Sequence, residues 1–122
     1  MPVTATVRQR CRSLLPQGEE LHYVFPATLT GSGGASHYLV VVTGLSVTVL
    51  ATKLFTRDEP AVVWARYPRR TRLGPVRHDS RPAIRLGDTL FEVEAEYVPV
   101  IAAADAEAFS PADLPKDPLP DL

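Results

Sequence analysis

Short stretches in which apolar and polar residues alternate fill the chain from residue 19 to residue 94, and they constrain the fold more than any other feature. Alternation with a period of two places the apolar side chains of a β-strand on one face. About seven such stretches follow one another at a spacing of roughly 8–12 residues, which is typical of an antiparallel sandwich or barrel. The sequence therefore predicts a mainly β protein.

Individual stretches predict which side chains face the core. In residues 21–29, every second residue is apolar, and residues 35–42 end in a continuous apolar run that predicts burial on both faces. In residues 62–65 either Val62 and Trp64 or Val63 and Ala65 fit the inward positions. Further strands are predicted over 47–52, 71–76, 81–86 and 89–94, with Gly87-Asp88 as a two-residue turn. The aromatic residues at inward positions are expected in the core rather than in a nucleic-acid platform: Tyr23, Phe25, Tyr38, Trp64 and Phe91.

Two helical patterns flank the strands. Val7, Cys11, Leu14 and Leu15 form one stripe and predict a short N-terminal helix over about residues 4–15. Alanines and a stripe that begins at Tyr97 predict a C-terminal helix over about residues 97–109. Residues 110–122 contain four prolines, which predicts a flexible tail. The alternative, which we favour less, is that the tail binds in a groove of a partner protein. Residues 1–109 are thus expected to form one domain.

Composition excludes several classes of protein. No apolar run approaches the ~20 residues of a membrane-spanning helix, and no secretory signal follows Met1. The single cysteine, Cys11, cannot form an internal disulfide, so a cytoplasmic location is expected. The net charge of -1 argues against nucleic acid as a partner.

Three segments resemble bacterial pleckstrin-homology-like (PH-like) domain proteins. Residues 14–20 (LLPQGEE) are similar to the entry of the first strand, residues 41–47 (VVTGLSV) to a "VVTDxRV" hairpin, and residues 91–93 with 101–106 to the closing strand and helix. The resemblance covers roughly residues 14–109. It implies an open barrel of about seven antiparallel strands that is capped by the C-terminal helix, and it brings no catalytic residues.

The sequence departs from this pattern at the residues that would bind lipid. Gly44 and Ser46 replace the Asp and Arg of the hairpin, and residues 31–37 contain no Lys or Arg. In PH domains that bind phosphoinositides, basic residues in that turn hold the phosphates. The resemblance therefore implies a fold more than a lipid site.

Arginines are concentrated between residues 66 and 85, where seven of them accompany one aspartate. Because a guanidinium binds phosphate or carboxylate in a bidentate manner, these residues are candidates for an anion or ligand site. The candidate site residues are Arg66, Arg69, Arg70, Arg72, Arg77 and Arg81. The alternative is internal ion pairing, for example with the carboxylates of Glu92, Glu94 and Glu96 on a neighbouring strand.

No motif predicts catalysis. His22, His37 and His78 lack the spacing of metal ligands, and Gly31-Ser32-Gly33-Gly34 lacks the Gly-Lys-Ser/Thr of a phosphate-binding loop. We therefore expect a non-enzymatic binding or scaffolding module that needs no cofactor and contacts a protein partner or a second copy of itself. One alternative is peripheral binding of anionic lipid or a phosphorylated ligand through residues 66–81. Another is a barrel with an internal ligand cavity.

Overall fold

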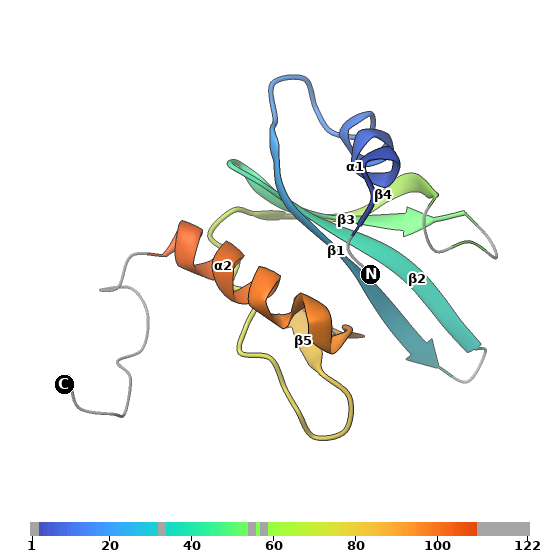
Figure 1. The fold of residues 1–122 in the computed structure, drawn as a ribbon, viewed down its shortest axis with the longest axis vertical. Coiled ribbons are helices and arrows are strands. Elements are labelled where there is room, and N and C mark those ends of the chain that lie inside the picture. The colour runs from blue at the N-terminus through green and yellow to red at the C-terminus, as the bar shows by residue number, and fades with distance from the viewer. Residues whose placement is uncertain (1–2, 32–33, 54–55, 57–58, 110–122) are drawn as a thin grey trace.

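The fold is an open antiparallel sheet between two helices (Figure 1). The computed structural model describes residues 3–31, 34–53, 56 and 59–109. The predicted tail, residues 110–122, lies outside the described residues. The elements are α1 (Ala5–Arg12), β1 (Leu21–Gly31), β2 (Gly34–Thr43), β3 (Ser46–Thr52), β4 (Pro60–Pro68), β5 (Ala83–Leu86), β6 (Thr89–Glu92), a 3-10 turn η1 (Ala95–Tyr97) and α2 (Val98–Ala108).

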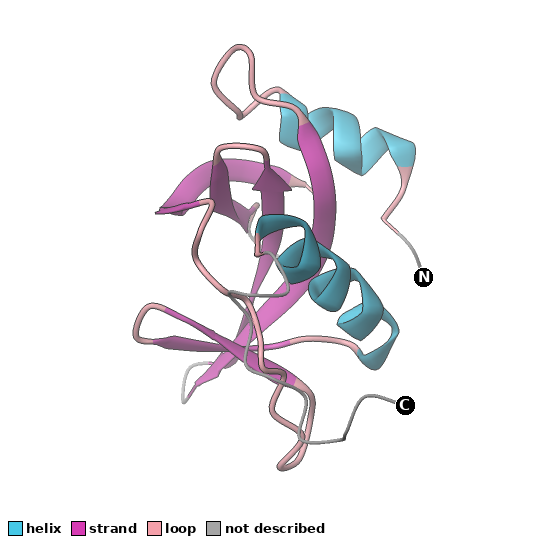
Figure 2. Ribbon diagram, turned by 90° about the vertical axis from the view of Figure 1, so that its left-hand side faces the viewer, coloured by secondary structure: helices cyan, strands magenta, loops and turns pink. Residues whose placement is uncertain are grey.

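The sheet has the strand order β4-β3-β2-β1-β6-β5, and every pair is antiparallel. Strand β1 pairs with β2 along its whole length and meets β6 where Thr28 opposes Glu92. The sheet curls strongly (Figure 2), so that Trp64 of β4 packs on Phe91 of β6 and Tyr67 of β4 lies beside the backbone of Gly87 in the β5–β6 turn. No hydrogen-bonded ladder among the described residues joins β4 to β5, so the sheet is not closed.

Both faces of the central strands are buried, as the apolar run of residues 35–42 predicts. Val40 and Val42 face the core that α2 covers, whereas Leu39 and Val41 face the cluster that α1 covers. The two helices accordingly lie on either side of the long strand β1 in Figure 1. The α2 side holds most of the large buried side chains, among them Phe25 and Phe91, each of which contributes about 1.5–3 kcal/mol by leaving water.

Helix α1 is stabilised by an N-terminal cap and by two buried side chains. The Thr4 side chain accepts a hydrogen bond from the Val7 amide at 3.2 Å and caps the first turn. Val7 and Cys11, one turn apart, are the buried residues of the helix and pack on Leu39 and Leu50. The helix ends at Arg12, earlier than predicted, and Leu14 and Leu15 follow in turns that pack on the same cluster.

The predicted strand over residues 71–76 is wrong. The segment between β4 and β5 contributes an isolated bridge between Arg77 and Ala83, and the described sheet has six strands. The physical reason is a competing partner: the amides of Leu73 and Gly74 donate to the carboxylate of Asp105 on α2, at 2.8 and 2.9 Å. Pro75 has no amide hydrogen to donate to a ladder.

The Gly87-Asp88 turn joins β5 to β6 as predicted. Gly87 has φ +59°, a left-handed conformation that favours glycine, and its α-carbon faces the ring of Tyr67. A methyl group added there would lie 3.2 Å from the Tyr67 hydroxyl. The turn therefore closes against β4, and this contact is one of those that bring the two ends of the sheet together.

Candidate functional site

The predicted arginine site is divided among separate acidic partners. Arg66, on β4, reaches across β3 to Glu19, where its Nη2 lies 2.7 Å from Oε2. Glu19 also accepts hydrogen bonds from the hydroxyls of Thr43, at 2.7 Å, and Ser46, at 2.8 Å. Only 2% of the Glu19 side chain is exposed. Burial alone would raise the pKa of this carboxyl, but the donated hydrogen bonds and the guanidinium outweigh it and hold the pKa below the usual value.

Arg69 and Arg72 lie instead at the carboxyl-terminal half of α2. The Arg69 Nη2 donates to the carbonyl of Ala104 at 2.7 Å and lies 3.9 Å from Glu107. The Arg72 Nε lies 3.9 Å from Asp105. A guanidinium near the last carbonyls of a helix is favourable, because those oxygens carry the negative end of the helix dipole. These two arginines therefore fasten the segment after β4 to α2.

The other candidate arginines are spread further. Arg77 pairs with Asp79 at 2.8 Å, and Arg81 lies 3.7 Å from Glu92, which is one of the acid–arginine contacts that the internal-pairing alternative anticipates. Arg70 lies over the ring of Phe109, 5.4 Å from its centre. The described residues therefore do not place the six arginines around one common site. An anion site formed by some of them is still a prediction.

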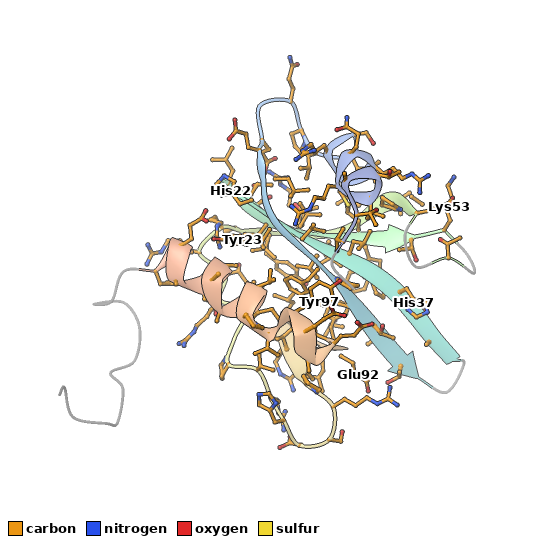
Figure 3. The ribbon with its side chains drawn as sticks, in the orientation of Figure 1. His22, Tyr23, His37, Lys53, Glu92 and Tyr97 are labelled. Carbon is orange, nitrogen blue, oxygen red and sulfur yellow. The ribbon has the colours of Figure 1, made fainter. Side chains whose placement is uncertain are left out.

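A second polar cluster joins the start of β1 to the end of α2. The Nδ1 of His22 contacts Glu107, and the Tyr23 hydroxyl donates to the same carboxylate; Figure 3 shows both side chains beside that end of the helix. The pKa of Glu107 is lowered, chiefly by the His22 contact, with burial opposing and Tyr23 and Arg69 assisting. The pKa of Tyr23 is raised by its hydrogen bond to Glu107 and by burial. These contacts attach the carboxyl end of α2 to the start of β1, which is a structural role.

A groove of about 820 Å³ lies between the amino end of α1, the β1–β2 hairpin and the segment that leads into α2. Its apolar lining includes Val3, Val7, Leu39, Tyr38, Val93 and Tyr97. Polar groups stand among them, including Thr28, which contacts the His37 ring at 3.3 Å, and Glu92. Figure 3 places Tyr97, His37 and Glu92 around this half of the hairpin. Neither the predicted strands nor the motifs pointed to this groove, because it is assembled from three distant segments.

The third feature is an apolar patch on the edge strand β4. Val62, Val63 and Trp64 are consecutive and are 58%, 46% and 42% exposed. The expectation that Trp64 is a core residue is therefore only partly met: its ring packs on Tyr38 and Phe91, at centroid distances of 5.1 and 5.8 Å, while much of it faces solvent. The alternatives for residues 62–65 also fail, since neither pair is fully inward. The register of β4 against β3 shifts at Trp64, between Val63 and Ala65, and again at Ala61, just before the patch.

The described residues offer no grouping for metal or nucleophilic chemistry. No cluster of three or more histidines, cysteines, aspartates or glutamates capable of holding a metal occurs in the part of the chain that the structure describes. Cys11 is fully buried under α1, and burial raises the pKa of its thiol to about 11 despite the nearby Arg8 and Arg12. The thiol is therefore protonated at neutral pH and is a packing group.

Comparison with known proteins gives no identification. No family model matches the chain, and no curated protein and no solved structure matches it. None of the helices in the described residues has the length and apolar character needed to cross a bilayer.

Asp105 is the important residue that the sequence reasoning missed. It is buried on α2 and binds two backbone amides of the segment that follows β4. A signal was present, because Ile101, Ala104, Asp105 and Ala108 have the i, i+3, i+4, i+7 spacing of a single buried face. A carboxylate on such a face requires a partner when it is buried.

Proposed function

We propose that this chain is a PH-like module that has no catalytic activity and that binds a protein partner through the patch Val62–Trp64 on β4. The PH-like assignment is supported by a curled antiparallel sheet followed by a helix that covers one face of it. The binding role is supported by the patch itself. Edge strands of proteins that work alone are usually protected by charged side chains, whereas β4 has three consecutive apolar ones.

The irregular backbone of β4 favours a partner that packs against its side chains over a partner that adds a strand to the sheet. Two register shifts interrupt β4, and proline occupies both of its ends, Pro60 and Pro68. Such irregularities disturb the row of backbone donors and acceptors that strand addition needs. Trp64 is held in place by two aromatic neighbours, so it offers a partner a rigid apolar surface at a small cost in entropy.

The alternative of anionic lipid or phosphate binding through residues 66–81 has less support. At least five of the six candidate arginines lie within 4 Å of a carboxylate oxygen of a described residue, and a phosphate would have to compete with those partners. Co-sedimentation with anionic vesicles at low ionic strength tests this alternative. Binding that disappears when Arg69, Arg70 and Arg72 are replaced by Glu would restore it.

Affinity capture from the native host tests the proposal. Four baits are compared: the wild-type chain, Val62→Lys, Leu90→Lys and a chain that ends at residue 109. Leu90, on β6 and 40% exposed, is the matched control because it is apolar and exposed and lies outside the patch. We expect a partner that is retained by the wild-type and Leu90→Lys baits and lost from Val62→Lys.

Other results of this experiment would assign the contact to a different part of the chain or contradict the proposal. Equal capture by Val62→Lys would remove β4 as the contact surface, and loss on truncation alone would assign the contact to residues 110–122. Light scattering of the purified chain detects a homo-oligomer, and a dimer that Val62→Lys dissociates would identify the partner as a second copy. A monomer without any captured protein would contradict the proposal.

A further inference from the structure

The groove between α1 and the segment leading into α2 has the size of a small-molecule site. Its volume, about 820 Å³, falls within the ~300–1,000 Å³ that is usual for such sites. Apolar side chains come from three separate segments: Val7 from α1, Leu39 from β2, and Val93 and Tyr97 from the segment after β6. None of the described residues that line it belongs to β4, so the groove is independent of the proposed protein contact.

The charged side chains that line the groove already have partners. Arg81 lies 3.7 Å from Glu92, and the carboxylate of Glu92 also accepts a hydrogen bond from the hydroxyl of Thr30. Glu94, which lines the same wall, has an interaction of its own. A charged ligand would have to displace these contacts before the groove could compensate the hydration that the ligand loses. The lining therefore favours an uncharged ligand.

The backbone of β1 presents one hydrogen-bond acceptor at this groove, the carbonyl of Pro26. Pro26 opposes Leu39 of β2, and because proline has no amide hydrogen this pair is of the kind that exchanges no hydrogen bonds. The Pro26 carbonyl therefore points to the other edge of β1, the edge on the side of β6. There β1 pairs with β6 at Thr28 and Glu92, and no loop amide of the described residues donates to Pro26. The groove lies along this edge, since Pro26 and residues 93–95 line it together.

We propose that this groove binds an uncharged alcohol with a hydrocarbon body. The apolar walls take the hydrocarbon part out of water. The hydroxyl group of the ligand donates a hydrogen bond to the Pro26 carbonyl, which pairs both polar groups as water is excluded. A peptide strand is a poorer occupant, because Pro26 lacks the amide hydrogen that strand addition would use at this position.

Two isomeric probes that differ in one hydrogen-bond donor test the proposal. Hexanol and pentyl methyl ether contain the same atoms, but only the alcohol can donate a hydrogen bond. Each is titrated into the isotopically labelled full chain, with amide chemical shifts as the readout. We expect both probes to shift the amides of Ala27, Thr28 and Val93 saturably, and hexanol to bind about three- to tenfold more tightly than the ether. Hexylammonium and hexanoate, which carry a charge on a chain of the same length, should both bind more weakly than hexanol.

A substitution that fills the groove locates the binding. Ala95 is exposed and lines the groove, so Ala95→Phe should occupy part of the volume and weaken hexanol binding several-fold. Ala102→Phe is the matched control, because Ala102 is exposed on α2 and lies outside the described lining. The amide spectrum of each variant shows before the titration whether it is folded. The comparison of the two isomers uses the wild-type chain, so it stands even if a variant does not fold.

Several results would overturn the inference. Equal affinities for hexanol and the ether would remove the Pro26 carbonyl as an acceptor, and a charged probe that binds as tightly as hexanol would refute the preference for an uncharged ligand. Shifts that cluster on β4, or a folded Ala95→Phe that binds hexanol as the wild type does, would place the binding elsewhere. The absence of saturable shifts would contradict a ligand site altogether. Since no protein partner takes part in these titrations, hexanol binding can succeed even when the protein-contact proposal fails.

Discussion

Replacement of Asp105 should reveal how the segment after β4 is held. Its carboxylate accepts hydrogen bonds from the Leu73 and Gly74 amides at 2.8 and 2.9 Å, and the Leu73 amide is buried. A hydrogen bond to a charged group contributes about 1.5–3 kcal/mol, so Asp105→Ala should destabilise the protein by about 3–5 kcal/mol. The better helix propensity of alanine offsets less than about 0.7 kcal/mol of this.

The conservative variant Asp105→Asn should lower the free energy of unfolding by less than Asp105→Ala does. In Asp105→Asn one oxygen still accepts, but the amide nitrogen cannot accept from the second N–H, so the variant should lose about half as much stability, roughly 1.5–2.5 kcal/mol. Both changes are measured by urea unfolding, with the free energy of unfolding extrapolated to water. Domains of this kind have total stabilities of about 5–15 kcal/mol, so the alanine variant should lose a large and readily measured share of the total.

The control is Asp79→Ala. Asp79 is exposed and pairs with Arg77 at the surface, so its loss should cost under about 1 kcal/mol. If Asp105→Ala cost no more than this control, the two amides would be equally well satisfied by water. The reasoning that the carboxylate replaces a seventh strand would then be refuted.

Three further predictions concern the acid, thiol and turn groups. The pKa of Glu19 is lowered in the folded protein, so its stabilising contribution is complete above the usual value of 4.5 and is lost as the pH falls through the lower folded-state value. In Glu19→Gln, the free energy of unfolding measured with urea should therefore fall less steeply as the pH is lowered. An unchanged pH dependence would contradict the hydrogen bonds and ion pair assigned to Glu19. Cys11, whose pKa is raised to about 11, should resist Ellman's reagent in the native protein and react once guanidinium unfolds it, whereas rapid native labelling would show that α1 detaches. Gly87→Ala should lower the melting temperature through about 1–2 kcal/mol of strain and crowding at Tyr67, while Gly31→Ala, with open space around it, should change it little; equal effects would disprove the steric argument.

Local patterns in the sequence predicted the elements whose surroundings they largely determine. The period of two predicted β1 and β3, the continuous apolar run predicted β2, and the stripe at Val7 and Cys11 predicted α1. Val47 and Val49 face the core as expected, but the other face of β3, with Ser46 and Thr48, is buried as well. The prediction failed for residues 71–76, a short stretch that Gly74 and Pro75 interrupt. There a side chain 32 residues away along the chain, Asp105, binds the amide of Leu73.

The candidate site was predicted less well than the fold. The density of arginines is a property of the sequence, but their partners are not: Arg66 finds Glu19 and Arg69 finds Ala104 and Glu107 only because the sheet curls and α2 crosses it. The exposure of Val62, Val63 and Trp64 follows from the position of β4 at the sheet edge, which no local pattern specifies.

The sequence by itself determined the class of this protein, a mainly β chain between two helices, because side-chain periodicity acts over a few residues at a time. Only the tertiary structure decided which apolar side chains stay exposed, which carboxylate holds which arginine, and where a groove opens between α1 and the start of α2. These features depend on contacts between residues far apart in the chain, and such contacts exist only after the sheet has curled and both helices have docked.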